Sequence, residues 1–269
     1  MIILYNLKAY GFEAAIRGMR NPMNSWDKMD SAFDGNKCII GPNDYNLMTK
    51  LISAGTEHRK FLRMIYVSMD VTAPLYWWKE FDTYKVGVTS NSCSTMHKIA
   101  SRHLDIKDFS ADQLNNENFE LFKNLLNQLN KYIDRYNTCS DENNRKKLWY
   151  QIIQMLPSSY MQKRTISMNY ENVFTIIHQR KEHKLNEWRE FVFSLMQLPH
   201  VKELLGGSVL DDYIYTKDIC KMYSVNEKTV YRWIRRGLLK SYKDSCGRYI
   251  FYKHDLNSFR YDPRNRRMK

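Results

Sequence analysis

The spacing of apolar residues along the first 207 positions predicts an irregular mixture of strands and helices. A largely apolar run over 1–7 and an alternation of apolar and polar residues over 61–71 predict two strands, while spacings of three and four residues predict helices. The predicted helices cover 13–19, 42–53, 169–180 and 186–196, with a longer helical stretch over 111–155 that Pro157 closes. Together these elements predict an α+β domain over residues 1–207, followed by a smaller domain over 208–269.

One segment of the predicted α+β domain carries candidate chemistry. A dense aromatic run over 73–84 leads into a loop over 87–97 that is rich in small and hydroxyl-bearing residues. Backbone amides and hydroxyls in such a loop suit a phosphate or a flavin, and the aromatic rings would supply flat apolar walls. A core helix followed by an ordinary turn explains the same residues. The sequence leaves both interpretations open.

The last quarter of the chain predicts two short helices joined by a tight turn. Thr216 is the candidate N-cap of the first helix and Asn226 that of the second, and Gly237 stands where a left-handed C-terminal cap is expected. Each helix has one apolar stripe, so we expect the two stripes to be buried against each other. The stripes consist of Ile219, Met222 and Tyr223 in the first helix and of Val230, Trp233 and Ile234 in the second.

Beyond the second helix, two apolar-alternating runs over 239–243 and 248–253 flank the turn-forming residues 244–247. This pattern predicts a β-hairpin, or wing. A short closing helix over 254–259 and a basic tail over 260–269 are expected after it.

The run Ser-Val-x-x-x-Thr-Val-Tyr-Arg-Trp-Ile-x-x-Gly over 224–237, followed by Gly-Arg-Tyr over 247–249, resembles winged helix-turn-helix domains of the MerR and excisionase type. The resemblance implies binding of double-stranded DNA, with the second helix in the major groove and the wing near the phosphate backbone. Side chains that donate to phosphates and base edges are expected at this interface. They are Lys217, Asn226, Lys228, Thr229, Tyr231, Arg232, Arg235, Arg236 and Arg248. A small helical domain that only packs on its own protein is the alternative.

Positive charge is concentrated in the same segment. Residues 209–269 hold fifteen lysines and arginines against seven carboxylates, a surplus of eight out of the chain's formal +13. A basic field attracts any polyanion and makes binding depend on salt, so the charge alone also fits RNA or an acidic membrane. The helix-turn-helix pattern, rather than the charge, favours DNA.

The composition predicts a packed protein, since 43% of the residues are hydrophobic and 14% are aromatic. No apolar run approaches the roughly 18 residues that cross a bilayer, and the first residues turn polar too early for a signal peptide. We therefore expect a cytoplasmic protein without membrane contact. The five scattered cysteines form no Cys-x-x-Cys pair, so we expect reduced, mostly buried thiols and neither a disulfide framework nor a metal site.

The order of segments over 1–200 resembles the flavin-dependent thymidylate synthases, the ThyX family. The similar stretches are Gly55-Thr56-Glu57-His58, Trp77-Trp78-Lys79-Glu80-Phe81, Asn91-Ser92-Cys93-Ser94, Asn169-Tyr170-Glu171-Asn172-Val173 with Arg180, and Asn186-Glu187-Trp188-Arg189-Glu190. The resemblance implies a ThyX-like fold, a homo-oligomer that is a tetramer in the family, and a pocket for FAD and a nucleotide. A retained pocket would use His58, Arg59, Lys85, Asn91, Ser92, Ser94, Arg180 and Arg189. Each of these also has a structural interpretation, such as helix capping for Ser92 and Ser94.

The chain departs from the family at the motif that holds phosphate. Where the family has Arg-His-Arg-x-x-Ser, this chain has Asp82, Thr83 and Tyr84, with Gly87 near the serine position. An acid in place of a cation repels a phosphate, and Lys85 supplies a point charge without the bidentate fork of arginine. We therefore expect the family reaction, reductive methylation of dUMP with flavin, NADPH and methylenetetrahydrofolate, to be lost or changed.

Two functions from different classes remain open. The first is a sequence-specific DNA-binding protein of regulator or excisionase type, suited to a phage or mobile element, whose degenerate ThyX-like domain oligomerises and binds a nucleotide or flavin. The second is an FAD-dependent thymidylate synthase, or a related pyrimidine-modifying flavoenzyme, with an accessory DNA-binding domain. Recognition of RNA by the basic domain is a third.

Overall fold

The computed structural model describes residues 1–35, 37–205, 213–243, 248–252, 256 and 259. The chain forms two compact units, and each of them is assembled from three separate segments. The first unit comprises Met1–Gly11, Leu62–Val173 and Glu182–Arg189, and the second comprises Phe12–Phe61, Phe174–Lys181 and Glu190–Lys269. The predicted domain boundary between residues 207 and 208 lies outside the described residues, so it stays a prediction.

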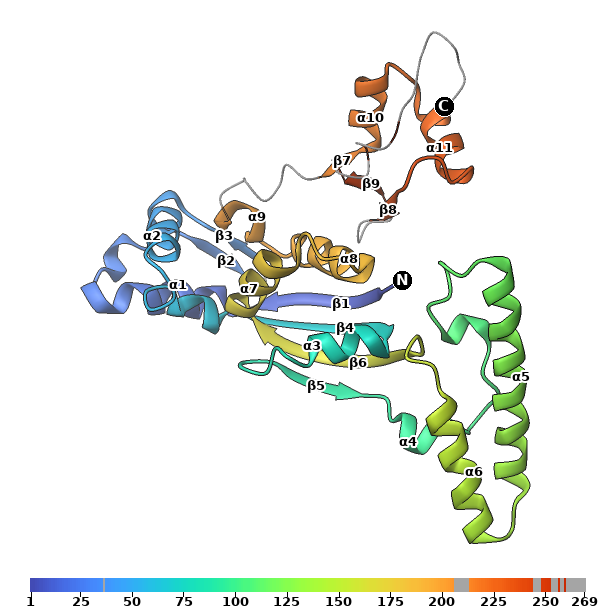
Figure 1. Ribbon diagram of the computed structural model, residues 1–269. Coiled ribbons are helices and arrows are strands. Elements are labelled where there is room, and N and C mark those ends of the chain that lie inside the picture. Colours follow the sequence, from blue (N-terminus) through green and yellow to red (C-terminus); the bar gives the residue numbers. More distant parts are fainter. Residues whose placement is uncertain (36, 206–212, 244–247, 253–255, 257–258, 260–269) are drawn as a thin grey trace. The chain divides into compact units, whose positions relative to one another are not determined.

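The first unit is built on a four-stranded antiparallel sheet in the order β1-β4-β6-β5 (Figure 1). Its strands are β1 (Ile3–Tyr10), β4 (Tyr66–Pro74), β6 (Met161–Asn169) and β5 (Thr89–Ser92). Alternate residues of β4 are buried, because successive side chains of a strand point to opposite faces of the sheet. The central strands β4 and β6 therefore carry the core, whereas all four residues of β5 are exposed at one edge.

An aromatic helix lies against this sheet. α3 (Leu75–Phe81) follows β4 directly (Figure 1). Its Trp77 and Trp78 side chains are buried. The Trp78 indole donates a hydrogen bond to the Gln162 carbonyl oxygen of β6 at 2.9 Å. The ring of Trp188 packs on that of Trp77, with 4.8 Å between the ring centroids. The aromatic run predicted from the sequence is thus a core helix that is fixed to a central strand.

The segment between β5 and β6 forms a helical hairpin with a core of its own. α5 (Asn116–Thr138) and α6 (Glu142–Met155) lie side by side after the short α4 (Thr95–Lys98) (Figure 1). Asn115 and Asp141 cap the two long helices by accepting backbone N–H groups. The buried residues of the hairpin core are Ile99, Ala100, Leu104, Phe109, Leu126, Leu129, Ile133 and Ile152. The long helical stretch predicted over 111–155 is confirmed from Asn116 onward, with a break at 139–141, whereas 111–115 are not helical.

A buried ion pair organises the start of the second unit. This unit contains α1 (Phe12–Arg20), the hairpin of β2 (Ala32–Asp34) and β3 (Lys37–Ile39), α2 (Pro42–Ser53) and α9 (Val201–Leu204). The Arg20 guanidinium contacts Asp44 at 2.7 Å, and the two side chains are 4% and 0% exposed. The second oxygen of Asp44 accepts hydrogen bonds from the backbone amides of Asp30 and Ser31. These contacts connect α1, the first turn of α2 and the residues just before β2.

Two further helices contribute residues to both units: α7 (Tyr170–Arg180) and α8 (Asn186–Leu195). Together with α1 and α2, they confirm the four shorter helices predicted in the α+β domain. Short 3-10 helices cover Asn21–Met23, Trp26–Lys28, Lys60–Met64 and Ile106–Asp108.

The end of the second unit combines two helices with a small sheet. Its elements are β7 (Tyr213–Tyr215), α10 (Thr216–Tyr223), α11 (Glu227–Arg235), β8 (Tyr242–Lys243) and β9 (Tyr249–Tyr252). The strands pair in the antiparallel order β7-β9-β8. The buried side chains that join helices and sheet are Ile219, Val230, Trp233, Leu239, Phe251 and Leu256. The second strand of the predicted wing is confirmed as β9, whereas the first, predicted over 239–243, is only Tyr242–Lys243. β7 adds a third strand that the sequence pattern did not indicate. The turn over 244–247, most of the closing helix over 254–259 and the tail over 260–269 lie outside the described residues.

Two predictions about the α+β domain are wrong in detail. The strand expected over 61–71 begins only at Tyr66, because Lys60–Met64 form a 3-10 helix. The hydroxyl-rich loop contains the strand β5, whose four residues pair with 164–167 of β6. That pairing spans more than seventy positions of the chain, so no local pattern specifies it.

The expectation of mostly buried thiols is also wrong. Of the cysteines that the structure describes, all free, Cys93 is exposed and Cys38, Cys139 and Cys220 are half-buried, while Cys246 lies outside the described residues. The described residues contain no group of three or more metal-ligating side chains, and none of their helices is long and apolar enough to cross a membrane.

Candidate nucleic-acid interface

The turn between α10 and α11 is fixed by its own backbone. Ser224 adopts the left-handed conformation with φ 52°, and the Val225 N–H donates to the Cys220 carbonyl oxygen at 3.0 Å. This arrangement satisfies a carbonyl at the end of α10 and reverses the chain within three residues. Asn226 then begins the second helix as its N-cap.

The first helix begins one residue away from the predicted cap. Its N-cap is Tyr215, and Thr216, the predicted cap, is the first helical residue and is buried. The Asp218 carboxylate accepts the Tyr215 N–H at 2.9 Å. The Asp218 side chain, inside the helix, therefore satisfies the backbone N–H of the N-cap residue. The general preference for threonine at the start of a helix did not indicate this contact.

Apolar packing on one side of α11 determines which of its side chains face outward. Val230 is fully buried and Trp233 is 3% exposed, in a core shared with Ile219 of α10 and Phe251 of β9. Because one face of the helix is fixed in this way, the polar residues between these positions are held on the opposite side.

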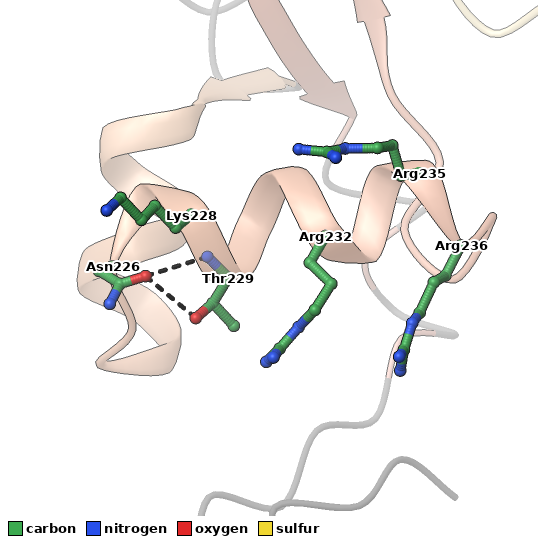
Figure 2. Close-up of a pocket in the computed structure, with 6 residues that line it drawn as sticks. All are labelled: Asn226, Lys228, Thr229, Arg232, Arg235 and Arg236. Atoms are coloured by element: carbon green, nitrogen blue, oxygen red, sulfur yellow. Dashed lines mark hydrogen bonds between the residues drawn. The ribbon is translucent and has the colours of Figure 1, made fainter.

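Both ends of α11 are capped as the sequence predicted. The Asn226 side-chain oxygen accepts the Thr229 N–H and also the Thr229 hydroxyl, both at 3.0 Å (Figure 2). At the other end, Gly237 has φ 66°, its N–H donates to the Ile234 carbonyl at 2.9 Å, and the Leu238 N–H donates to the Trp233 carbonyl at 3.0 Å. Backbone N–H and C=O groups at both ends of the helix are therefore satisfied.

A hollow of about 590 Å³ lies along the outward side of α11 (Figure 2). Its lining consists of Asn226, Lys228, Thr229, Arg232, Arg235 and Arg236. Lys228 and the three arginines are exposed, and none of the four has a carboxylate within ion-pair distance among the residues that the structure describes. Six of the nine residues predicted to contact DNA thus lie together on one surface, four of them as exposed cations.

The other three predicted residues lie outside this hollow. Tyr231 is half-buried, and its ring packs on that of Tyr249 with 5.7 Å between the centroids. Lys217 is exposed on α10. The Arg248 guanidinium lies over the ring of Tyr215 at 5.0 Å. Tyr231 therefore contributes to the packing of the helix on the wing, whereas Lys217 and Arg248 lie on other parts of the helix-turn-helix domain.

Two titratable groups of α10, Cys220 and Tyr223, stay neutral at pH 7. Burial and the nearby Glu227 carboxylate raise the pKa of the Cys220 thiol. Burial likewise raises the pKa of the Tyr223 phenol. The charge of this surface is therefore carried by lysine and arginine side chains.

The eight residues predicted for a flavin or nucleotide pocket are divided between the two units. His58, Arg59 and Arg180 belong to the second unit, and Lys85, Asn91, Ser92, Ser94 and Arg189 belong to the first. Asn91 and Ser92 lie on the exposed edge strand β5. Ser94 is the N-cap of α4 and accepts the His97 N–H at 3.2 Å, so the capping interpretation holds for this residue. The Arg189 guanidinium donates to the side-chain oxygen of Asn186.

The residues at the position of the family's phosphate motif do not fit a phosphate. Asp82 forms an ion pair with Arg164 of β6 at 2.7 Å. The Thr83 hydroxyl donates to the Glu80 carbonyl at 2.7 Å, and the Tyr84 ring packs against Trp188 at 5.9 Å. These side chains already have partners within the unit, and Asp82 would repel an anion.

Arg164 is a cation of this region that does not belong to the predicted site residues. Its guanidinium lies 4.2 Å from the ring centre of Trp78 and donates to the Gln162 side-chain oxygen at 3.0 Å, in addition to its pair with Asp82. On β6, Arg164 occupies the same face as the buried Ile166. An arginine among the inward-facing residues of a strand would have indicated this role, but the sequence pattern did not predict the strand β6.

Comparisons with known proteins agree with this description. Residues 214–260 match the family model described as a helix-turn-helix domain. Over 78% of this chain and 98% of the other, the fold is similar to that of thymidylate synthase X (ThyX) from Helicobacter pylori, solved with FAD and dUMP, with a TM-score of 0.50 and 16% identity. A UMP/dUMP methylase, PolB, from Streptomyces cacaoi is similar over 77% of this chain and 94% of its own, with a TM-score of 0.50 and 11% identity. No curated protein matches the chain.

The similarity to these proteins establishes the fold of the chain. The chain combines a ThyX-like α+β fold with a C-terminal helix-turn-helix domain. At 11–16% identity, the neighbours' ligands and activities do not follow from the shared fold.

Proposed function

We propose that this protein binds double-stranded DNA through α11, in the manner of MerR-type and excisionase-type proteins, and that its ThyX-like domain serves as an oligomerising body. The observation that carries the proposal is the row of four exposed cations along the outward side of α11, with no acidic partner among the described residues. A capped helix of this kind can enter a major groove and place its donors against phosphates and base edges.

A homo-oligomer would give such a small module useful affinity. One short helix makes few contacts, but linked copies bind neighbouring half-sites at a high effective concentration. The resemblance to the ThyX family supports a tetramer. The expected target is therefore a repeated or palindromic site, and the oligomeric state in solution can be measured by light scattering.

The DNA-binding proposal is tested by selecting duplexes from a random pool and measuring affinity at physiological salt. Replacing both Arg232 and Arg235 by alanine should lower the affinity for the selected duplex by about 10- to 1,000-fold, because at least two charge-assisted contacts are lost. A matched control replaces the exposed Arg17 and Arg63, which removes the same charge elsewhere in the chain. If the variant at Arg232 and Arg235 binds the selected duplex with the same affinity as the variant at Arg17 and Arg63, the proposal is wrong. Competition with duplex RNA separates DNA from RNA as the ligand.

For the ThyX-like domain, we propose loss of the family's flavin chemistry. The pairing of Asp82 with Arg164 supports this, because the position expected to hold phosphate presents a carboxylate that is already bound to a cation. The alternative flavoenzyme predicts a visible flavin absorption band after incubation with FAD and gel filtration. A retained band would contradict the proposed loss. The same experiment with dUMP and isothermal titration tests the nucleotide ligand.

A further inference from the structure

Five of the six side chains that line the hollow on α11 are arranged in an arc around one residue, and only the N-cap Asn226 lies outside this arc. Successive residues of an α-helix turn by about 100°, so the arc from Arg235 to Thr229 covers about 120° of the helix circumference. Arg232 lies at its midpoint. Lys228 and Arg235 lie about 40° to 60° to one side of Arg232, and Arg236 and Thr229 lie about 40° to 60° to the other.

Figure 2 shows the same division, because Arg235 and Arg236 leave the helix on opposite sides. Along the helix axis, Arg232 is also midway between Lys228 and Arg236. A helix that enters a groove with this surface presents its middle to the floor of the groove and its flanks to the two walls.

We infer that Arg232 reads a guanine base in the major groove, while Lys228, Arg235 and Arg236 contact the phosphates of the two strands that border it. This inference rests on the DNA-binding function proposed above. The floor of the major groove consists of base edges and its walls are phosphate backbones, so the central side chain meets bases and the flanking cations meet phosphates. The guanidinium of arginine pairs in a bidentate manner with guanine O6 and N7.

The contacts of Asn226 favour guanine over adenine as the base that is read. Adenine is read in a bidentate manner by an asparagine or glutamine amide, which must offer both its oxygen and its nitrogen. The oxygen of Asn226 already accepts the Thr229 N–H and hydroxyl, both at 3.0 Å. Releasing it would uncap the helix, so the amide in the hollow is committed to structure and arginine is left as the base reader.

Arg232 has no competing task within the described part of the chain. It is exposed, and no carboxylate lies within ion-pair distance of it among the described residues. The helix that carries it is held by Val230 and Trp233 in the core and is capped at both ends. A helix held in this way fixes the backbone position from which the Arg232 side chain extends, and a defined position relative to the base is what discrimination between bases requires.

The test measures affinities of the full-length protein for its selected duplex and for duplexes in which each G·C pair is replaced in turn. One replacement should weaken wild-type binding by about 5- to 150-fold, the range expected when a bidentate contact is lost. Arg232→Ala should bind the original and replaced duplexes alike. Arg232→Lys should lose most of the preference while it keeps the salt dependence, because lysine has the charge without the fork.

Two matched variants supply the contrast. Arg235→Ala and Arg236→Ala should weaken binding to all duplexes by a similar factor and reduce the slope of log affinity against log salt by about one, and both should keep the wild-type preference for guanine. A second measurement replaces the implicated guanine by 7-deazaguanine, which lacks the N7 acceptor. This base should weaken binding of the wild type and leave binding of Arg232→Ala unchanged.

The outcomes separate the inference from the proposed function. If the wild type binds with sequence preference but that preference survives in Arg232→Ala, or moves to Arg235→Ala or Arg236→Ala, the inference is wrong and the DNA-binding function stands. If the wild type binds duplex DNA without any preference, no base is read and the inference is again wrong. If it does not bind duplex DNA at all, the proposed function fails with it. Thermal melting of each variant verifies that the exposed substitutions leave the fold intact.

Discussion

The arginines of α11 and the arginine in the middle of β6 carry the same charge in opposite surroundings. Arg164 is 14% exposed. Its guanidinium lies 2.7 Å from the Asp82 carboxylate and 4.2 Å from the centre of the Trp78 ring. Arg232 is exposed and has no acidic partner among the described residues. A guanidinium that its own fold satisfies stabilises that fold, whereas one that is left unsatisfied on a rigid surface is available to a ligand.

The difference between paired and unpaired arginines explains why charge alone is a poor guide to function. Arg20 represents the extreme case of a satisfied cation, because its partner Asp44 is fully buried and accepts additional backbone hydrogen bonds. In a sequence, Arg20, Arg164 and Arg232 are indistinguishable. Their roles differ because of the carboxylates that the fold places beside them.

The largest effect on the free energy of unfolding is expected at Arg20, whose ion pair with Asp44 is buried. Asp44→Ala leaves the Arg20 charge buried without its partner and should lower the free energy of unfolding by about 3–5 kcal/mol. Urea denaturation followed by tryptophan fluorescence measures it. The control is Glu13→Ala, which removes an ion pair with Arg17 whose side chains are both 60% exposed and should cost at most about 0.5 kcal/mol. Equal losses in the two variants would show that burial does not determine the strength of these pairs.

An intermediate effect on stability is expected for Arg164, and almost none for Arg232. Arg164→Ala should lower the free energy of unfolding by about 1–2 kcal/mol, since a charged hydrogen bond and a ring contact are lost but Asp82 is half exposed to water. Arg232→Ala should change it by less than about 0.5 kcal/mol. Urea denaturation of the two variants in parallel provides the measurement, and a larger loss for Arg232→Ala would reverse the roles assigned here.

The smallest effect is expected for the pair of Arg102 and Asp108, in which the arginine side chain is largely exposed. Partial burial acts to raise the pKa of Asp108, but hydrogen bonds from Arg102 and from the Asp105 backbone outweigh it and leave the pKa below its ordinary value. A depressed pKa contributes stability above the unfolded-state pKa of about 3.9, and this stability is lost as the pH falls through the folded-state pKa.

Arg102→Gln should therefore lose less stability than the wild type when the pH is lowered from 5 to 3. Denaturation at both pH values measures the difference. Because the Arg102 side chain is 57% exposed, water screens the pair and the effect is expected to be modest. Identical acid sensitivity in the two proteins would assign the loss to other carboxylates.

Local sequence signals determined the helix-turn-helix and most of the other helices. The cap at Asn226, the left-handed glycine at Gly237 and the apolar spacing of Val230 and Trp233 act within a few residues, so they are legible without a structure. Together they also identified the six residues of the hollow on α11.

Tertiary structure decided the features that join distant parts of the chain. The sheet order β1-β4-β6-β5 pairs strands that are far apart in sequence, and β5 carries no apolar alternation that would mark it as a strand. The partner of Arg164 is Asp82, 82 positions away. Helix caps and stripes have a fixed spacing that a sequence displays, whereas the partners of a strand or of an arginine depend on how the whole chain packs. Local patterns therefore reveal which surface is basic and helical, whereas the packing of the whole chain selects the cations that remain available to a ligand.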